Sequence, residues 1–473
     1  MRQVLFSRRA VAPSVTLIYA QTDPNENKPD ILHYAPFVAN QVSNISFINH
    51  KKIKEEKKIT WSITINENEI QSVSYNEIEQ GLAETWKIAL WGDYRDKKVI
   101  EYIKRLFPLT LGCLEEENSW HLHQGIQLRE IPTDEKLYHK PELQGKMVLD
   151  AKKMSKSGYR FSFPQIALNK VITEKNCYIR KQSGDIGINI VKAPHFVINP
   201  NYCAYSDQDF VIPHSQIGMS VTWDDSRHLQ AISVLINSSI IQYYLFFCSP
   251  SWGIERDKVY LEDVKKIPIP NLSQKQIDDL AILQEHLASE ELFGKKNNLQ
   301  EILDSEVNHI LKIPDTLRIV CKEFIEIRLT LSQGKTKTIA TEPPSIQEDL
   351  PNYAERLRYE LDNFVEGSDI RHAISITTSE NLIVCTVELY NSETEIPVKI
   401  KKANAQDAQF LREIQQKLRE EFSKRFYIQR GMRLFSDTQI HICKSPRLID
   451  WTQTQAMYDS DDIIAEMLNR RNY

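Results

Sequence analysis

Two carboxylates and a lysine near the N-terminus have the spacing of a metal-dependent nuclease site. Pro29-Asp30 is followed by Glu55-Glu56-Lys57. This arrangement imitates a PD…ExK set, in which two acids hold a divalent ion and a lysine positions the attacking water. The second acid and the lysine lie in the segment KKIKEEKKI, and such mixed charges are typical of a solvated face. A stand-alone restriction or defence nuclease with an unrecognised site therefore stays an alternative.

Other metal and phosphate patterns in the sequence are weaker. His121 and His123 could bind a metal from one strand, but no third ligand lies near them in the sequence. Only 14 glycines occur, and they form neither a P-loop nor a GxGxxG motif. The seven cysteines are scattered at intervals of 26 residues or more. This spacing indicates reduced thiols rather than a zinc site or a disulfide framework.

The string Asn199-Pro200-Asn201-Tyr202 differs by one residue from the Asn-Pro-Pro-aromatic loop that grips an exocyclic amine. In that loop the Asn side chain and a proline carbonyl accept hydrogen bonds from the target NH2, and the aromatic ring stacks on the flipped base. The second proline is missing here, and no glycine-rich turn that would approach a methyl donor lies upstream. We interpret these residues as a turn.

The positive feature of the sequence is a basic stretch over residues 151–182. It holds eight Lys or Arg against one Glu, a local charge of +7, with Tyr159, Phe161, Phe163 and Tyr178 interleaved. Cations that displace condensed counterions bind DNA phosphates, and some Lys and Arg side chains read guanine edges in the major groove. A solvated basic face is the alternative interpretation. The predicted DNA contacts are Lys152, Lys153, Lys156, Arg160, Lys170, Lys175, Arg180 and Lys181.

The composition restricts where such binding can occur. The 473 residues carry a net charge of −5, so any DNA binding must be local. The longest apolar stretch, residues 231–248, is interrupted by Asn237, Ser238, Ser239 and Gln242. Because of these interruptions a membrane span is not expected, and we expect a cytoplasmic protein.

Hydrophobic patterning predicts the elements that position these residues and gives an α+β fold class. Residues 1–40 carry short β-forming runs, with QTDPNENKPD as the turn between two strands. Residues 41–270 read as a mixed α/β region, with helical spacing over residues 80–107 followed by short strands.

Helical spacing returns over residues 271–335, where we expect up to three helices that act as a spacer. Ser273 is placed to be the N-cap of the first helix. The polar, proline-containing segment SQGKTKTIATEPPSIQEDLP predicts a linker. Beyond it, residues 345–473 read as a C-terminal α+β domain with a helix, three strands, a helix, a hairpin and a last helix.

Several short motifs occur in order between residues 231 and 280. They are Ile236-Asn237-Ser238, Gly253-Ile254-Glu255-Arg256, the acidic-aromatic segment 259–263, and Pro268-Ile269-Pro270 before a helix. This order resembles the end of the target-recognition domain of N6-adenine DNA methyltransferases in the type II/IIG restriction-modification group with TaqI-like specificity domains. The Pro-x-Pro-then-helix element is also similar to type I specificity subunits. Residues 203–211 and 426–468 resemble further segments of the same family.

The resemblance extends to the first residues, RQVLFSRRAVAPSVTLIYA, which look like the last strands of a methyltransferase sheet. It implies that the S-adenosylmethionine-binding and catalytic motifs belong to a core before residue 1 or on a partner subunit, so no catalytic residue carries over. Strands without their neighbours expose edges that invite pairing with another chain. We therefore expect a split enzyme or a truncated reading frame.

The family likeness makes this chain a candidate DNA-recognition component, with double-stranded DNA and a methyltransferase core as partners. The turn Trp252-Gly253 with Arg256 is a second predicted DNA contact, although a purely structural role for the turn is the alternative. Recognition is assigned to residues 41–270. A non-catalytic decayed fragment and a free-standing specificity subunit also stay open as interpretations of the chain.

Overall fold

A computed structural model describes most of the chain beyond residue 69. The described residues are 30–34, 70–129, 137–180, 186–253, 258–295, 297–332, 338–380, 382–391, 397–404, 432–435 and 438–470, with a few single positions between 407 and 414. The chain divides into two compact units, one of residues 95–335 and one that combines residues 1–94 with 336–473. Helices and several small sheets confirm the α+β class.

The described N-terminal part is a small strand pair followed by helices. Strand β1 (Ile31–Tyr34) pairs antiparallel with β2 (Ile70–Val73), and helices α2 (Tyr75–Gln80) and α3 (Ala83–Trp91) follow. The predicted strand at residues 31–34 is confirmed, whereas the strands predicted over residues 4–19 lie outside the described residues. The predicted helical stretch 80–107 is helical but breaks after α3.

The unit of residues 95–335 is built around a four-stranded antiparallel sheet with the order β11-β10-β13-β4. Helix α8 (Ser226–Asn237) packs on β10 and β11 and leads into α9 (Ser239–Cys248). Both helices are apolar because both are buried within the unit. The sheet strands are β4 (His121–Gln124), β10 (His195–Asn199), β11 (Tyr202–Ser206) and β13 (Ile217–Ser220). Smaller elements are α4 (Tyr94–Leu106), β3 (Leu109–Thr110), α5 (Leu111–Asn118), α7 (Ile186–Asn189), α10 (Leu261–Lys265) and β14 (Pro268–Ile269).

The basic stretch contributes one strand to each of two three-stranded sheets and forms short helices before and between these strands. One sheet has the order β12-β7-β8 and the other β5-β9-β6. Buried side chains such as Leu149, Met154 and Phe210 form the core under this part. The strands are β5 (Leu128–Arg129), β6 (Leu137–His139), β7 (Met147–Val148), β8 (Lys170–Val171), β9 (Tyr178–Arg180) and β12 (Phe210–Val211), and the helices are α6 (Ala151–Ser157), η3 (Gln165–Ala167) and η4 (Glu174–Asn176).

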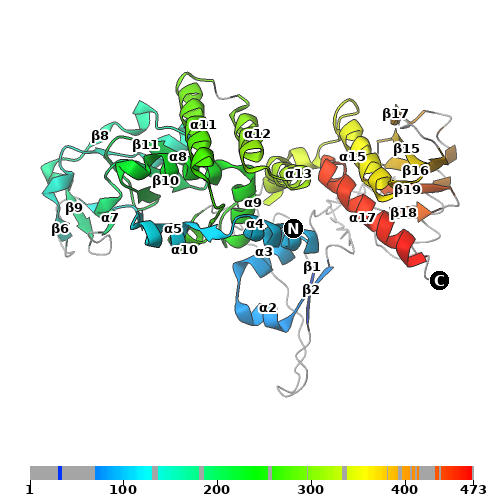
Figure 1. Cartoon of the computed structure of the whole chain (residues 1–473), viewed down its shortest axis with the longest axis horizontal. Coiled ribbons are helices and arrows are strands. Elements are labelled where there is room, and N and C mark those ends of the chain that lie inside the picture. Colours follow the sequence, from blue (N-terminus) through cyan, green and yellow to red (C-terminus); the bar gives the residue numbers. More distant parts are fainter. Residues whose placement is uncertain are drawn as a thin grey trace, which may run out of the picture. The chain divides into compact units, whose positions relative to one another are not determined.

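The helices after residue 272 are part of the same unit rather than a spacer. Ser273 caps α11 with a full capping box, as predicted. Leucines of α11 and α12 share one core with α8 and with Phe161, and Figure 1 shows α11 beside α12. The apolar face that predicted these helices is therefore buried against α8 and Phe161. The elements are α11 (Gln274–Leu292), α12 (Leu299–Leu311), α13 (Asp315–Glu323), a π-helical turn (Phe324–Arg328) and α14 (Leu329–Ser332).

The C-terminal part is a five-stranded mixed sheet covered on one face by two helices. The strand order is β17-β15-β16-β19-β18, with only β17 parallel to its neighbour. Helices α15 (Asp349–Phe364) and α17 (Gln453–Arg470) lie side by side over the sheet (Figure 1) and share its core. The predicted strands and hairpin are confirmed; most of the predicted helix 407–422 lies outside the described residues. The strands are β15 (Ile370–Thr378), β16 (Ile383–Asn391), β17 (Lys399–Lys402), β18 (Met432–Phe435) and β19 (Gln439–Lys444).

None of the described helices, taken singly, combines the length and hydropathy that a membrane span needs. The segments Trp223–Asn237 and Ser239–Cys248 reach these values only as a pair, and that pair is bent by 68°. Their apolar side chains are largely buried in the unit of residues 95–335.

Candidate nucleic-acid interface

Helix α6 presents the first lysines of the basic stretch to solvent. Asp150 is its N-cap and accepts a hydrogen bond from the Lys153 backbone N–H at 3.1 Å. Met154 is fully buried and anchors the inner face of the helix. Lys152 and Lys156 are exposed and lie four residues apart, so they share the outer face.

Strand β8 brings a further lysine next to α6. Lys170 is exposed and stands opposite Val148 in the β7–β8 pair. The Lys153 Nζ donates to Asn169 Oδ1 at 3.2 Å. The backbone N–H of Lys153, and then the charges of Lys170 and Lys153, lower the pKa of the Asp150 carboxyl. Lys152, Lys153, Lys156 and Lys170 therefore form one basic surface.

Apolar side chains flank this basic surface. Ile166 in η3 is 60% exposed, and Val171, next to Lys170, is 54% exposed. Lys175 is also exposed, in η4. The side chains of Arg180 and Lys181 lie outside the described residues. Of the eight predicted lysines and arginines, Lys152, Lys156, Lys170 and Lys175 are thus exposed, and Lys153 and Arg160 are half-buried.

The Arg160 guanidinium, by contrast, is hydrogen-bonded to other groups of the protein. Its guanidinium donates to Gln300 Oε1 and to the Asn237 carbonyl, the latter at 3.3 Å. Burial lowers the pKa of the Arg160 side chain. A guanidinium held this way links the basic stretch to α8 and α12, so we leave Arg160 out of the DNA-contact set.

Glu291, at the end of α11, fixes the backbone next to Arg160. Its carboxylate accepts hydrogen bonds from the backbone N–H groups of Arg160 (2.6 Å), Phe161 (3.0 Å) and Ser162 (3.0 Å), and from the Ser162 hydroxyl (2.8 Å). Glu291 is 1% exposed, and burial raises the pKa of its carboxyl although these bonds oppose the rise. The sequence offered no signal for this role, because Glu291 is one acid among several in α11.

Asn237, from the motif Ile236-Asn237-Ser238, is a second buried connector. Its side-chain oxygen accepts from the Cys203 backbone N–H at 3.0 Å. Its Nδ2 donates to the Cys203 carbonyl at 2.7 Å and to the Ser233 carbonyl at 3.1 Å. The amide thus pairs with strand β11 as a neighbouring strand would. This motif residue joins α8 to the sheet.

The predicted contact at Trp252 and Gly253 is also internal. Trp252 is 3% exposed. Gly253 has φ +75°, and a Cβ there would lie 2.5 Å from the Phe246 ring. The Gly253 carbonyl accepts from the Ser332 hydroxyl at 2.7 Å. The turn therefore packs against α9 and α14, as the purely structural interpretation expects, and Arg256 lies outside the described residues.

The turn interpretation of residues 199–202 is confirmed. Asn199 and Tyr202 face each other across the β10–β11 hairpin. The Tyr202 ring is 1% exposed, and its hydroxyl donates to Gln216 Oε1 at 2.9 Å. A ring in this position is part of the core and does not stack on a base.

The metal patterns gain no support from the described residues. His121 and His123 lie on β4, and His123 Nδ1 is 2.7 Å from the Gln124 carbonyl oxygen. Within the described ranges no group of three or more His, Cys, Asp or Glu could hold a metal ion. Asp30 accepts a hydrogen bond from the Ser72 hydroxyl at 3.0 Å, whereas Glu55, Glu56 and Lys57 lie outside these ranges.

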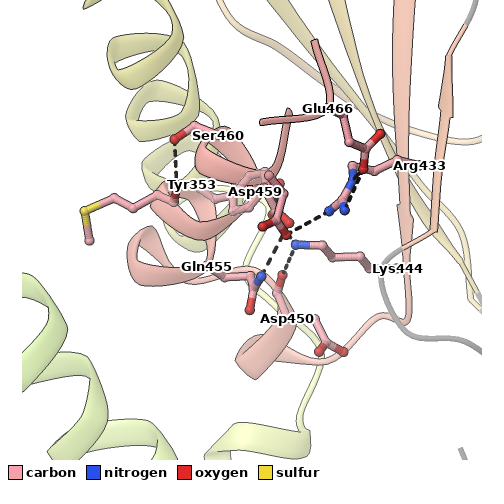
Figure 2. A network of polar contacts seen from close by, with 10 residues as sticks. Tyr353, Arg433, Lys444, Asp450, Gln455, Asp459, Ser460 and Glu466 are labelled. Atoms are coloured by element: carbon pink, nitrogen blue, oxygen red, sulfur yellow. Dashed lines mark hydrogen bonds and ion pairs between the residues drawn. The ribbon is translucent and has the colours of Figure 1, made fainter. Parts of the chain in front are cut away.

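A buried polar cluster in the C-terminal part was missed by sequence reasoning (Figure 2). Lys444 and Asp459 are 4% and 3% exposed and form an ion pair. The Tyr353 hydroxyl donates to the Asp459 carboxylate at 2.7 Å, and the Lys444 ammonium lies 5.2 Å from the Tyr353 ring and 5.5 Å from the Trp451 ring. The cluster connects β19 with α15 and α17 and is satisfied by protein groups, so we assign it to stability.

Comparison with models of known protein families gives no match for this chain. Comparison with curated protein sequences gives none either.

Proposed function

We propose that this chain binds double-stranded DNA through the basic surface and acts as the recognition component of an N6-adenine DNA methyltransferase system. The resemblance of residues 231–280 to target-recognition domains supports the second half of the proposal. The observation that carries the first half is the basic surface itself, Lys152, Lys153, Lys156 and Lys170, on a chain whose net charge is −5.

The local charge favours a polyanion over a small ligand. Residues 137–180 contain nine Lys or Arg and three acids, and one of the acids, Asp150, is occupied as the cap of α6. Lysines spread over a helix and a strand suit phosphates that repeat along a backbone, because each cation releases its own counterion. Ile166, in η3 beside α6, adds an exposed apolar side chain that suits contact with a thymine methyl group.

Methyl transfer would need a separate catalytic core. The sequence has no glycine-rich donor motif, and Tyr202 of the Asn-Pro-Asn-Tyr string is buried. By the family resemblance, S-adenosylmethionine would bind to a methyltransferase core in the same cytoplasmic assembly. Co-expression with the upstream gene, followed by a methylation-sensitive digest, tests this part of the proposal.

The DNA-binding half is tested by fluorescence anisotropy of the full chain with a labelled duplex at several salt concentrations. The variant Lys152→Ala/Lys156→Ala/Lys170→Ala is expected to bind about 10- to 100-fold more weakly and to flatten the salt slope by roughly 2 to 3, since each phosphate contact contributes about 0.9. Lys275→Ala, an exposed lysine at the start of α11, is the control. Equal binding by the triple variant would contradict the assignment of this surface.

A further inference from the structure

The turn between α11 and α12 carries an apolar tip. Phe293 is 79% exposed, the highest value among the large apolar side chains of the described residues, and its neighbour Leu292 is 56% exposed. Lys295 follows, with a side chain that is 70% exposed and paired with Glu290. Two adjacent exposed apolar residues next to a lysine form a small amphipathic projection, which we call the 292–295 tip.

The backbone holds this tip in a fixed conformation. The N–H of Phe293 donates to the Ser289 carbonyl at 3.0 Å, that of Gly294 to the Glu291 carbonyl at 3.1 Å, and that of Lys295 to the Glu290 carbonyl at 3.0 Å. Gly294 has φ +82°, as is common at helix C-termini. The Phe293 ring is therefore presented to solvent by a rigid turn, and little ordering entropy is lost when it binds a ligand.

The same turn is tied to the basic surface. Glu291, two residues before Phe293, binds the backbone N–H groups of residues 160–162. Lys156 lies four residues before Arg160, at the end of α6. The Gln284 side chain reinforces the contact by donating to the Phe161 carbonyl at 3.0 Å. Hydrogen bonds thus connect the helix end that carries the tip to the segment that follows α6.

We propose that the 292–295 tip is an apolar wedge that enters the DNA duplex held by the basic surface. This inference rests on the proposed function. Proteins that bend DNA insert Phe or Leu side chains between base steps while nearby cations hold the phosphates. Phe293 supplies the ring, and Lys152 and Lys156 supply the cations on a separate element. An anionic membrane also combines negative charge with an apolar interior, and it is the competing outcome of the test.

The test compares the full chain with Phe293→Ala on an intact duplex and on the same duplex with a single mismatch. Insertion costs less where bases are already unpaired, so the wild-type chain is expected to prefer the mismatched duplex. Phe293→Ala is expected to lose this preference and to bind the intact duplex about tenfold more weakly, as for loss of one base–aromatic contact. Its salt slope should stay unchanged, because no phosphate contact is removed. Ile282→Ala, also an exposed apolar residue of α11 (55%), is the matched control.

The two proposals fail in different ways. If the triple-lysine variant binds weakly but Phe293→Ala behaves like the wild-type chain on both duplexes, the wedge is wrong and the DNA-binding proposal stands. If the wild-type chain binds no duplex, both proposals are wrong. Binding to vesicles of phosphatidylcholine and phosphatidylserine that is lost in Phe293→Ala, without any change in duplex binding, would assign the tip to a lipid surface instead.

Discussion

At the scale of single residues, Asn237 and Glu291 connect separate segments of the unit of residues 95–335. The Asn237 side chain pairs with the backbone of Cys203 on β11, and the Glu291 carboxylate accepts hydrogen bonds from three backbone N–H groups. A buried polar group costs free energy unless it is bonded, so such residues restrict which backbone may lie next to them. We therefore expect replacement of Asn237 or Glu291 to disturb the packing of the unit of residues 95–335.

Gly253 gives a test of this packing role. Gly253→Ala is expected to destabilise the chain by about 3 kcal/mol or more, since the new methyl group would overlap the Phe246 ring and the positive φ is strained for Ala. Gly145→Ala is the control, because Gly145 has φ +81° but nothing within 4 Å of the added Cβ. It should cost only about 1 kcal/mol. Equal losses in urea unfolding would show that packing at residue 253 is unimportant.

His195 predicts a pH dependence of stability. It is fully buried in β10, its Nδ1 lies 2.7 Å from the Ile190 carbonyl oxygen, and burial lowers its pKa from 6.5 to about 4. As pH falls below 6.5 the unfolded chain takes up a proton at this residue and the folded chain does not, so stability is lost between pH 6.5 and 4.

The expected size of this loss is about 2 kcal/mol between pH 7 and pH 5. His195→Gln keeps a side-chain N–H donor but cannot titrate, so it should lack this part of the loss. The measurement is urea unfolding of both proteins at the two pH values. The same pH dependence in both would mean that His195 does not titrate as its burial indicates.

At the scale of elements, α17 is clamped to the sheet by buried charge. Lys444 on β19 forms an ion pair with Asp459 on α17. The Asp459 carboxylate also accepts a hydrogen bond from the Tyr353 hydroxyl, and the Lys444 ammonium lies over the Tyr353 and Trp451 rings. Half-buried Arg433 on β18 also pairs with Asp462 on α17 at 3.0 Å. Burying the Lys444–Asp459 ion pair costs free energy, but removing one of its charges destabilises a protein more than replacing both residues with apolar ones.

Lys444→Met should therefore destabilise the chain by about 3–5 kcal/mol, because Asp459 would stay buried without its cation. Lys444→Met/Asp459→Leu is expected to recover part of this loss. The control is Lys401→Met, which breaks an ion pair with Asp407 at a lysine that is 58% exposed and should cost less than about 1 kcal/mol. A double variant no more stable than Lys444→Met, in thermal unfolding, would contradict the clamp.

At the scale of the whole molecule, the helices after residue 272 belong to the compact unit of residues 95–335. Leu280, Leu287 and Leu303 are fully buried against α8 and Phe161. The helices of a spacer would pack their apolar faces against one another or against a partner protein. Here that face completes the core of the unit of residues 95–335.

A pair of fragments tests this boundary. Residues 92–335 are expected to unfold cooperatively in urea, because the core of α8, α11 and α12 is intact. Residues 92–271 expose that apolar face of α8 and are expected to aggregate or to unfold without a cooperative transition. A cooperative transition of the shorter fragment at the same midpoint would restore the interpretation of the helices as a spacer. Circular dichroism during titration is a sufficient measurement.

Local features of the fold, namely helices, strands and a turn, could be predicted from the sequence. Helical spacing and the Ser273 cap predicted α11, β-forming runs predicted β15 and β16, and the proline-containing string at residues 199–202 predicted a turn. These features depend on interactions between residues that are close in the sequence, so local patterns are enough to predict them. The positive charge of residues 151–182 also follows directly from the sequence.

Which of the basic residues face solvent depends on long-range packing. Lys156 and Arg160 are four residues apart and have the same charge, yet Arg160 is drawn inward by groups about 77 and 140 positions away, the Asn237 carbonyl and Gln300. The exposure of Phe293, the burial of Trp252 and the packing of α11 in the unit of residues 95–335 likewise depend on the tertiary structure. Burial depends on partners that are distant in sequence, and local patterns do not contain that information.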